Sequence, residues 1–95
     1  MQIKVIEQLN LNKARHNKMQ REEVYELIKS SFNEKEAMKG ISDDENFFSR
    51  GVSSLTVVEL QIAIEKSLNV TVQTSDLMRA PTIGEWVELY ASQNG

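Results

Sequence analysis

The residue with the clearest chemical potential is Ser54, which stands where a loop is expected to give way to a helix. A polar approach, an aromatic pair and one glycine precede it in the stretch Asn46-Phe47-Phe48-Ser49-Arg50-Gly51-Val52-Ser53-Ser54-Leu55. At a helix start, free backbone N–H groups and the helix dipole lie beside the serine hydroxyl, and both favour an attached phosphate. The residues alone therefore favour a simple capping serine at Ser54, with a phosphodiester site as the alternative.

Other catalytic and metal-binding chemistries are poorly supported by the residues. A serine hydrolase needs a histidine base and an orienting acid. The single histidine, His16, lies in a polar stretch far from Ser54 and is expected to be an ordinary solvated residue. The consecutive acids Asp43, Asp44 and Glu45 match neither a paired carboxylate site nor the spacing of a calcium loop. We therefore expect no catalytic residue and no metal site.

Bulk composition predicts one small domain. The 95 residues, 40% of them apolar, can build a single modest core but not a deep enzyme cleft. Cysteine is absent, so thiol chemistry would need an imported group. A net charge of −3 argues against a nucleic-acid partner. No run reaches the length of a membrane span and the first residues lack a signal-peptide pattern, so we expect no membrane partner and a cytoplasmic location.

The spacing of apolar residues predicts the elements that must position Ser54. A first helix is expected over about 20–35, with a core face made of Val24, Leu27, Ile28 and Phe32. The connection over 36–53 is long for a small domain, and its expected anchors onto the core are Ile41, Phe47 and Phe48. We therefore expect an ordered loop ahead of Ser54.

The second helix is predicted over Ser54–Leu68 and carries two apolar stripes. One stripe, suited to the core, is Val57, Leu60, Ile64 and Leu68. The other, well round the cylinder, is Leu55, Val58 and Ile62. Two readings of the second stripe are open: a central helix contacted on two sides, or an exposed docking surface for partner proteins.

The remaining segments complete a helical chain. Residues 69–74 alternate like a strand but are expected to form an extended connector. A short third helix is expected over Asp76–Arg79, capped by Thr74 or Ser75 and stopped by Pro81. A fourth helix, over about 83–92, follows a capping-box spacing and has an expected core face of Ile83, Trp86, Val87 and Tyr90.

The stretch from Phe47 to Leu55, continued by Val57-Val58-Glu59-Leu60, resembles the attachment site of acyl and peptidyl carrier proteins. In that family a Gly-x-(Asp or His)-Ser-Leu sequence carries 4′-phosphopantetheine on its serine. The resemblance extends over residues 20–92, includes the turn Pro81-Thr82-Ile83, and leaves residues 1–19 outside as a leader to a carrier domain at 20–95. It implies an all-α fold: a small four-helix bundle of the acyl-carrier type, with a long loop between helices 1 and 2 and a short third helix.

Two residues depart from the family pattern. Ser53 stands where the family commonly has Asp or His, and Arg50 stands where a leucine is usual before the glycine. The missing acid bears on which transferase modifies Ser54. Because Ser54 and Leu55 are retained, modification of Ser54 is still expected.

The resemblance also implies a function and a set of partners. A phosphopantetheinyl transferase would move the arm from coenzyme A to Ser54, and the arm's thiol would hold an acyl or aminoacyl group as a thioester. The protein would be a monomer and no enzyme itself, working with an adenylation or acyl-activating enzyme and with downstream synthetase or synthase domains. Leu55, Val58 and Ile62 lie where carrier proteins present their docking surface.

The pathway is indicated less directly. The double phenylalanine resembles peptidyl carriers of nonribosomal peptide synthesis, a secondary metabolism, whereas Val58-Glu59-Leu60 resembles acyl carriers of polyketide or fatty acid synthesis. The second helix has few acidic residues, so partner recognition should rest on apolar contact more than on charge. The sequence favours a freestanding peptidyl carrier. The alternatives are an acyl carrier protein, a carrier-like adaptor that lacks the prosthetic group, and a small hydrolase that uses Ser54.

Overall fold

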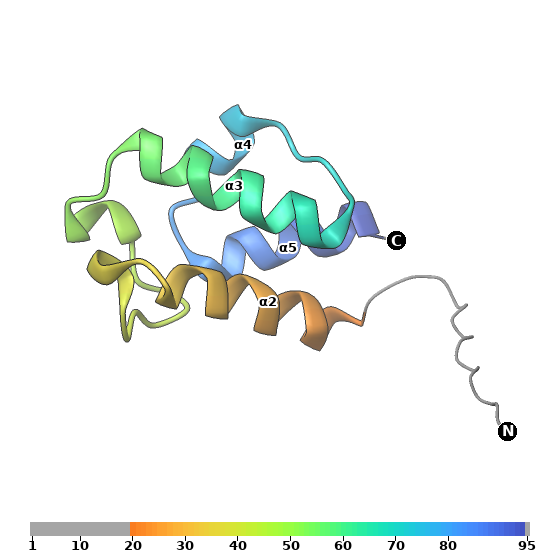
Figure 1. Cartoon of the computed structure of the whole chain (residues 1–95), viewed down its shortest axis with the longest axis horizontal. Coiled ribbons are helices and arrows are strands. Elements are labelled where there is room, and N and C mark those ends of the chain that lie inside the picture. Colours follow the sequence, from red (N-terminus) through yellow and green to blue (C-terminus); the bar gives the residue numbers. More distant parts are fainter. Residues whose placement is uncertain (1–19, 95) are drawn as a thin grey trace, which may run out of the picture.

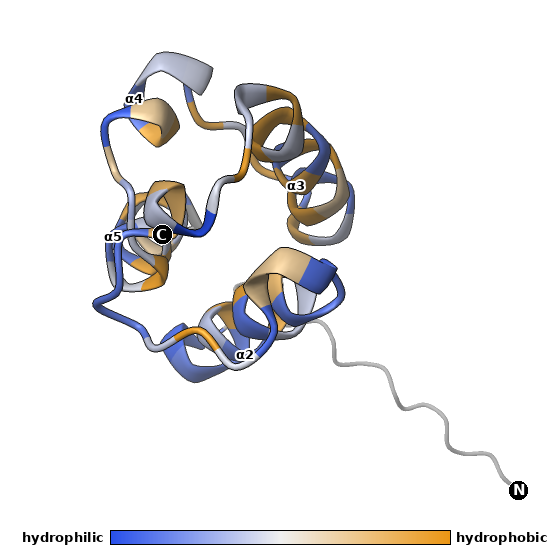
Figure 2. Cartoon of the chain, turned by 90° about the vertical axis from the view of Figure 1, so that its left-hand side faces the viewer, coloured by the Kyte–Doolittle hydropathy of each residue, from blue (hydrophilic) through white to orange (hydrophobic). Residues whose placement is uncertain are grey.

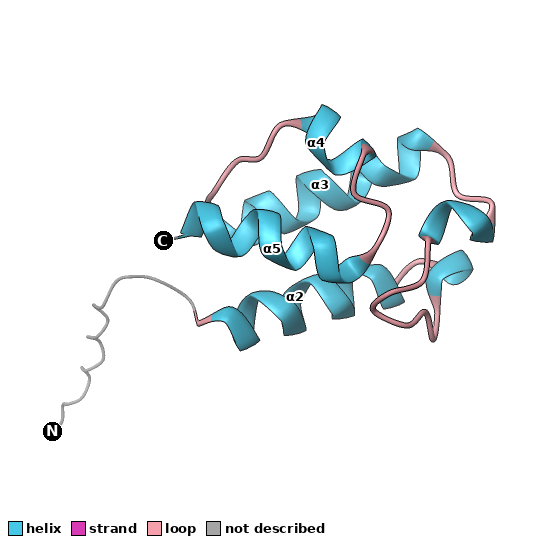
Figure 3. Cartoon of the chain, turned by 180° about the vertical axis from the view of Figure 1, so that it is seen from behind, coloured by secondary structure: helices cyan, strands magenta, loops and turns pink. Residues whose placement is uncertain are grey.

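The computed structural model describes residues 20–94, and every regular element in them is helical (Figure 3). The elements in chain order are α2 (Arg21–Asn33), η1 (Glu36–Met38), η2 (Phe47–Arg50), α3 (Ser54–Leu68), α4 (Thr74–Met78) and α5 (Ile83–Asn94), where η denotes a 3₁₀ turn. This confirms the all-α bundle with a long first loop and a short third helix. The expected leader at 1–19, with His16, lies outside the described residues. None of the described helices is long and apolar enough to cross a membrane.

The three long helices pack around one core. α2 contacts both α5 and α3, and α4 packs against α3. Figure 2 shows α2, α3 and α5 around a common interior, with α4 at one side. In Figure 1 the loop that carries η1 and η2 lies at the end of the bundle where α3 begins. The loop is therefore placed to control the start of α3.

The predicted core faces are confirmed. Buried side chains on the three long helices are Val24, Ile28, Phe32, Val57, Leu60, Ile64, Leu68, Ile83, Trp86, Val87 and Tyr90, and Leu27 is partly buried against them. The predicted loop anchors are confirmed as well: Ile41 and Phe47 are buried, and Phe48 is partly buried. The core thus joins the long loop to the helices.

An aromatic cluster makes that junction. The ring of Trp86 meets Phe32 and Phe47 edge-on, with centroids 5.0 Å and 5.8 Å away, and Phe32 lies 5.4 Å from Phe47. Edge-to-face geometry places the positive edge of one ring on the negative face of another. The buried indole nitrogen Nε1 also donates a hydrogen bond to the carbonyl of Ala80 at 2.7 Å. One buried residue therefore fixes α2, the loop and the chain ahead of α5 together.

The connector after α3 has no regular secondary structure over residues 69–73, and side chains satisfy part of its backbone. The N–H of Val72 donates to Glu65 Oε2 at 3.0 Å, and Gln61 Nε2 donates to the carbonyl of Val72 at 3.0 Å. The hydroxyl of Tyr90 donates to the same Glu65 oxygen at 3.0 Å. Burial, followed by this bond to a carboxylate, raises the pKa of Tyr90 above its ordinary value. These side-chain hydrogen bonds take the place of those that a partner strand would make.

The prediction for the third helix was wrong in its start and its cap. α4 begins at Thr74, two residues before the expected Asp76, its N-cap is Gln73, and no side chain caps it. The hydroxyl of Thr74 instead donates to Gln61 Oε1 at 2.8 Å. The Thr74 hydroxyl, which was expected to cap α4, therefore binds α3 instead. Elsewhere the helix limits agree within two residues, which is the usual uncertainty of helix ends.

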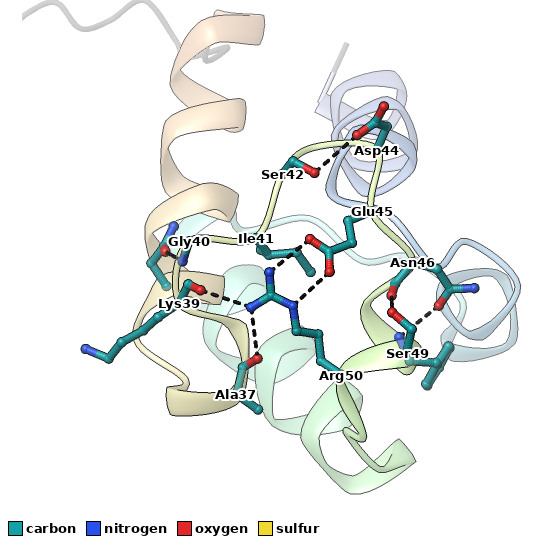
Figure 4. Close-up of polar contacts among 12 residues, drawn as sticks. Ala37, Lys39, Gly40, Ile41, Ser42, Asp44, Glu45, Asn46, Ser49 and Arg50 are labelled. Carbon is teal, nitrogen blue, oxygen red and sulfur yellow. Dashed lines mark hydrogen bonds and ion pairs between the residues drawn. The ribbon is translucent and has the colours of Figure 1, made fainter.

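The loop ahead of α3 is tied by a charged fork between Arg50 and Glu45 (Figure 4). Nε and Nη2 of Arg50 each donate to one oxygen of the Glu45 carboxylate, both at 2.9 Å. A bidentate pair of this kind is both stronger and more directional than a single charged hydrogen bond. The hydrogen bonds from Arg50 lower the pKa of the Glu45 carboxyl. Both side chains are partly shielded from solvent, so the fork holds the loop in one geometry.

We predict that Tyr90→Phe lowers the free energy of unfolding by about 1 kcal/mol, because it removes a partly buried hydrogen bond to Glu65. Urea unfolding followed by circular dichroism measures the change. Tyr25→Phe is the matched control, since it removes the same hydroxyl from a longer bond, 3.2 Å, to Asp43. Tyr25→Phe should lower the free energy of unfolding by less than Tyr90→Phe does. An equal or greater loss in Tyr25→Phe would contradict the stabilising role of the Tyr90–Glu65 hydrogen bond.

We predict that the stabilisation contributed by the Glu45–Arg50 fork disappears in acid. Because the pKa of Glu45 is lower in the folded chain than in the unfolded one, its contribution is complete above the unfolded value of about 4.3 and is lost as the pH falls through the folded value. The difference in unfolding free energy between wild type and Glu45→Gln should therefore be constant near neutral pH and shrink below about pH 4. A difference that does not change with pH would refute this prediction.

Candidate functional site

Ser54 is the first residue of α3, as predicted, and its side chain is exposed. The cap of this helix, however, is Ser53, whose backbone is extended and whose hydroxyl accepts a hydrogen bond from the N–H of Thr56 at 3.4 Å. The prediction that Ser54 is a simple capping serine is wrong, because Ser53 fills that role. The hydroxyl of Ser54 therefore takes no part in capping α3.

The backbone around Ser54 offers donors for an anion. The N–H groups of Thr56 and Val57 both donate to the carbonyl of Ser53, at 3.1 Å and 3.4 Å. In the described part of the chain, the N–H groups of Ser54 and Leu55 donate to no protein acceptor. The first turn of α3 holds no acidic residue that would repel a negative charge. Two free donors and the positive end of the helix dipole therefore fit a phosphate on the Ser54 hydroxyl.

The turn before the site depends on a glycine. Gly51 ends η2 with φ +82°, in the left-handed region that L side chains rarely adopt, and its N–H donates to the carbonyl of Phe48 at 3.1 Å. Val52 then lies partly buried against the core. The chain leaves the anchored loop at Gly51 and reaches the exposed surface at Ser54 within one turn.

The two stripes of α3 face different environments. All four residues of the first stripe are buried. In the second stripe, Leu55 is 66% exposed, Ile62 is 63% exposed, and Val58 is partly buried. Within residues 20–94, α3 is contacted by both α2 and α4, but neither helix covers Leu55 or Ile62, so these contacts do not account for the second stripe. These two side chains leave an apolar surface beside Ser54.

The acidic run ahead of the site is used for internal contacts. Asp43 accepts hydrogen bonds from Lys29 Nζ at 2.7 Å and from the hydroxyl of Tyr25 at 3.2 Å, and the bond from Lys29 lowers the pKa of the Asp43 carboxyl. Glu45 is held by Arg50. Within residues 20–94, no group of three potential metal-ligating side chains comes together. Asp43 and Glu45 thus secure the loop.

Sequence reasoning missed two residues that shape this site. Ser53 was noted only for replacing the family's Asp or His, although serine and aspartate are comparable helix caps and either could have been expected to cap α3. Arg50 was noted only for replacing a leucine. Its fork with Glu45 spans a loop with no periodic spacing, so no local pattern indicated it.

A comparison with models of protein families matches residues 22–90 to the family described as phosphopantetheine attachment site. Neither a search of curated proteins nor a search of solved structures found a match. The matched range contains α3 whole, and it reaches from the first turn of α2 into α5. Members of the family carry 4′-phosphopantetheine covalently. The chain therefore belongs to the phosphopantetheine attachment site family, as a protein that carries this prosthetic group.

Proposed function

We propose that this protein tethers acyl or aminoacyl intermediates as thioesters on a 4′-phosphopantetheine arm attached to Ser54. We further propose that it is a peptidyl carrier of nonribosomal peptide biosynthesis, with the carrier domain at 20–95 and residues 1–19 as a leader to that domain. The observation that carries the assignment to Ser54 is the exposed hydroxyl at the first position of α3, beside two free N–H donors.

The surroundings of Ser54 suit attachment and give no means of catalysis. When bound, the arm supplies a thiol, which the cysteine-free chain lacks. The N–H groups of Ser54 and Leu55 would face the phosphate, and Ser53 would keep the helix capped without adding a negative charge. The described residues include no histidine that could activate Ser54 as a nucleophile. The chain therefore serves as the acceptor, and partner enzymes perform the chemistry.

Carrier domains generally work with a phosphopantetheinyl transferase and with synthetase partners. For this chain the proposed partners are a transferase that delivers the arm from coenzyme A, an adenylation or acyl-activating enzyme that loads the cargo, and downstream synthetase domains. Leu55, Val58 and Ile62 are the proposed docking residues. Ile62 lies about 12 Å along the helix axis from Ser54, so a partner that reaches the arm can also cover this surface.

The peptidyl assignment is supported by the charges of α3. Its two acidic residues both have internal partners: Glu59 pairs with Lys35 at 2.9 Å, and Glu65 is bound by Tyr90 and the connector. An α3 with so little free negative charge suits recognition through apolar contact. The second candidate is an acyl carrier of polyketide or fatty acid synthesis, which Val58-Glu59-Leu60 favours. A third is an adaptor without the arm, which the absent acid at Ser53 favours.

We predict that the full chain, incubated with coenzyme A and a broad-specificity phosphopantetheinyl transferase, gains the mass of one phosphopantetheine. Ser54→Ala should gain none. Ser53→Ala is the matched control: it should still be modified, although loss of the cap lowers the free energy of unfolding by about 1 kcal/mol. Intact-protein mass spectrometry reads all three. Failure with several transferases, or a mass gain that survives in Ser54→Ala, would refute the assignment and, in the first case, favour the adaptor.

We predict that Ile62→Asn raises the KM of the transferase for the carrier several-fold, because the docking surface loses roughly 1 kcal/mol of apolar contact. Initial rates over a range of carrier concentrations measure the effect. Ser67→Asn places the same side chain at another exposed position of α3 and should leave KM unchanged. Equal KM values for Ile62→Asn and wild type would remove Ile62 from the docking surface.

A further inference from the structure

Arg50 makes more contacts than its ion pair with Glu45. Its third guanidinium nitrogen, Nη1, donates to the carbonyl of Lys39 at 3.0 Å and to that of Ala37 at 3.4 Å. Figure 4 shows the guanidinium between these two carbonyls on one side and the Glu45 carboxylate on the other. One side chain therefore joins the end of η2 to three separate points of the preceding loop.

The turns joined in this way have little stability of their own. η1 has three residues and η2 has four, and 3₁₀ turns have poorer hydrogen-bond geometry than α-helices. The region is anchored in the core by three buried side chains, Met38 of η1, Ile41 and Phe47 of η2. Arg50 is the last residue of η2, and its side chain is partly exposed. Without Arg50, η2 would be held by Phe47, by the partly buried Phe48 and by its own few hydrogen bonds.

The position of Arg50 links these contacts to Ser54. Directly after Arg50 comes Gly51, whose lack of a side chain allows many backbone conformations. The cap residue Ser53 follows after one partly buried residue. The start of α3 is therefore held from the helix side by its cap, and from the loop side by Arg50 across a flexible glycine.

We propose that Arg50 is a positioning residue for Ser54, which holds the η2–α3 junction in the geometry that the phosphopantetheinyl transferase recognises. The inference rests on the proposed attachment at Ser54. The family's usual leucine could contribute apolar contact at this position but no hydrogen bond to the carbonyls of Ala37 and Lys39. Lysine would keep the charge but has no planar fork with which to bind Glu45 at two points. The arginine thus replaces an apolar anchor with a directional polar one.

The test compares transferase kinetics of the full-length wild type, Arg50→Met and Arg50→Lys. In Arg50→Met the transferase would have to order a loosened junction before it binds the carrier. We expect KM for the carrier to rise roughly tenfold, which corresponds to the conformational entropy of ordering about one residue, while kcat is unchanged. KM for Arg50→Lys should lie between the values for wild type and Arg50→Met. Arg21→Met is the matched control, because Arg21 also pairs with a glutamate, Glu88, but joins α2 to α5. It should keep the wild-type KM.

Amide hydrogen exchange provides a readout that does not depend on the transferase. In Arg50→Met the hydrogen-bonded amides of Gly51, Thr56 and Val57 should exchange faster, while the amides of the buried residues Leu60 and Ile64 in the same helix keep their protection. If KM and exchange in Arg50→Met both equal those of wild type, the positioning role is refuted. If protection falls equally along all of α3, Arg50 acts on global stability only and the role is also refuted. If the wild type is never modified, the proposed function is wrong, and the exchange rates still decide whether Arg50 orders the junction.

Discussion

The burial of Phe47 is the contact on which the rest of this structure depends. The connection between α2 and α3 is long, and it carries two short turns that could not hold a fixed shape alone. Phe47 packs its ring against both Phe32 and Trp86, and its N–H donates to the carbonyl of Pro81 at 2.9 Å. Burying such a ring contributes about 2 kcal/mol, and each aromatic pair adds about 1 kcal/mol. The loop is thereby attached to the segment that starts α5, and the position of Ser54 follows from that attachment.

A small domain must use each helix for more than one purpose, and α3 shows how. Its buried stripe supplies a large part of the core, its C-terminal half binds the connector through Gln61 and Glu65, and its N-terminus displays Ser54. These uses occupy different faces and ends of one cylinder, so they do not compete. The helix is apolar on two sides but only one side packs into the core, so Leu55 and Ile62 on the other side stay exposed.

The sequence predicted well those features that depend on local chemistry. The limits of α3 were correct, because the periodic apolar pattern begins directly after the two serines and ends at Leu68. The predicted start of the third helix was wrong, because the hydroxyl of Thr74 bonds to Gln61, thirteen positions away, and does not cap the N–H groups of its own helix. The fork of Arg50 and the network of Glu65 were missed for the same reason: each joins residues whose proximity only the packed fold creates.

The two departures from the family pattern are best understood together. Ser53 performs the capping that an aspartate would perform, but it removes one negative charge from a position next to the Ser54 hydroxyl. Arg50 adds a positive charge in place of an apolar side chain, but Glu45 pairs with it at two points. Relative to a family member with Asp at position 53, the site therefore has one negative charge fewer, which makes the N-terminus of α3 more favourable for a phosphodiester. Under the proposed attachment at Ser54, a transferase finds no acid at position 53 and would rely more on the shape of the junction, which is the property that we propose Arg50 holds.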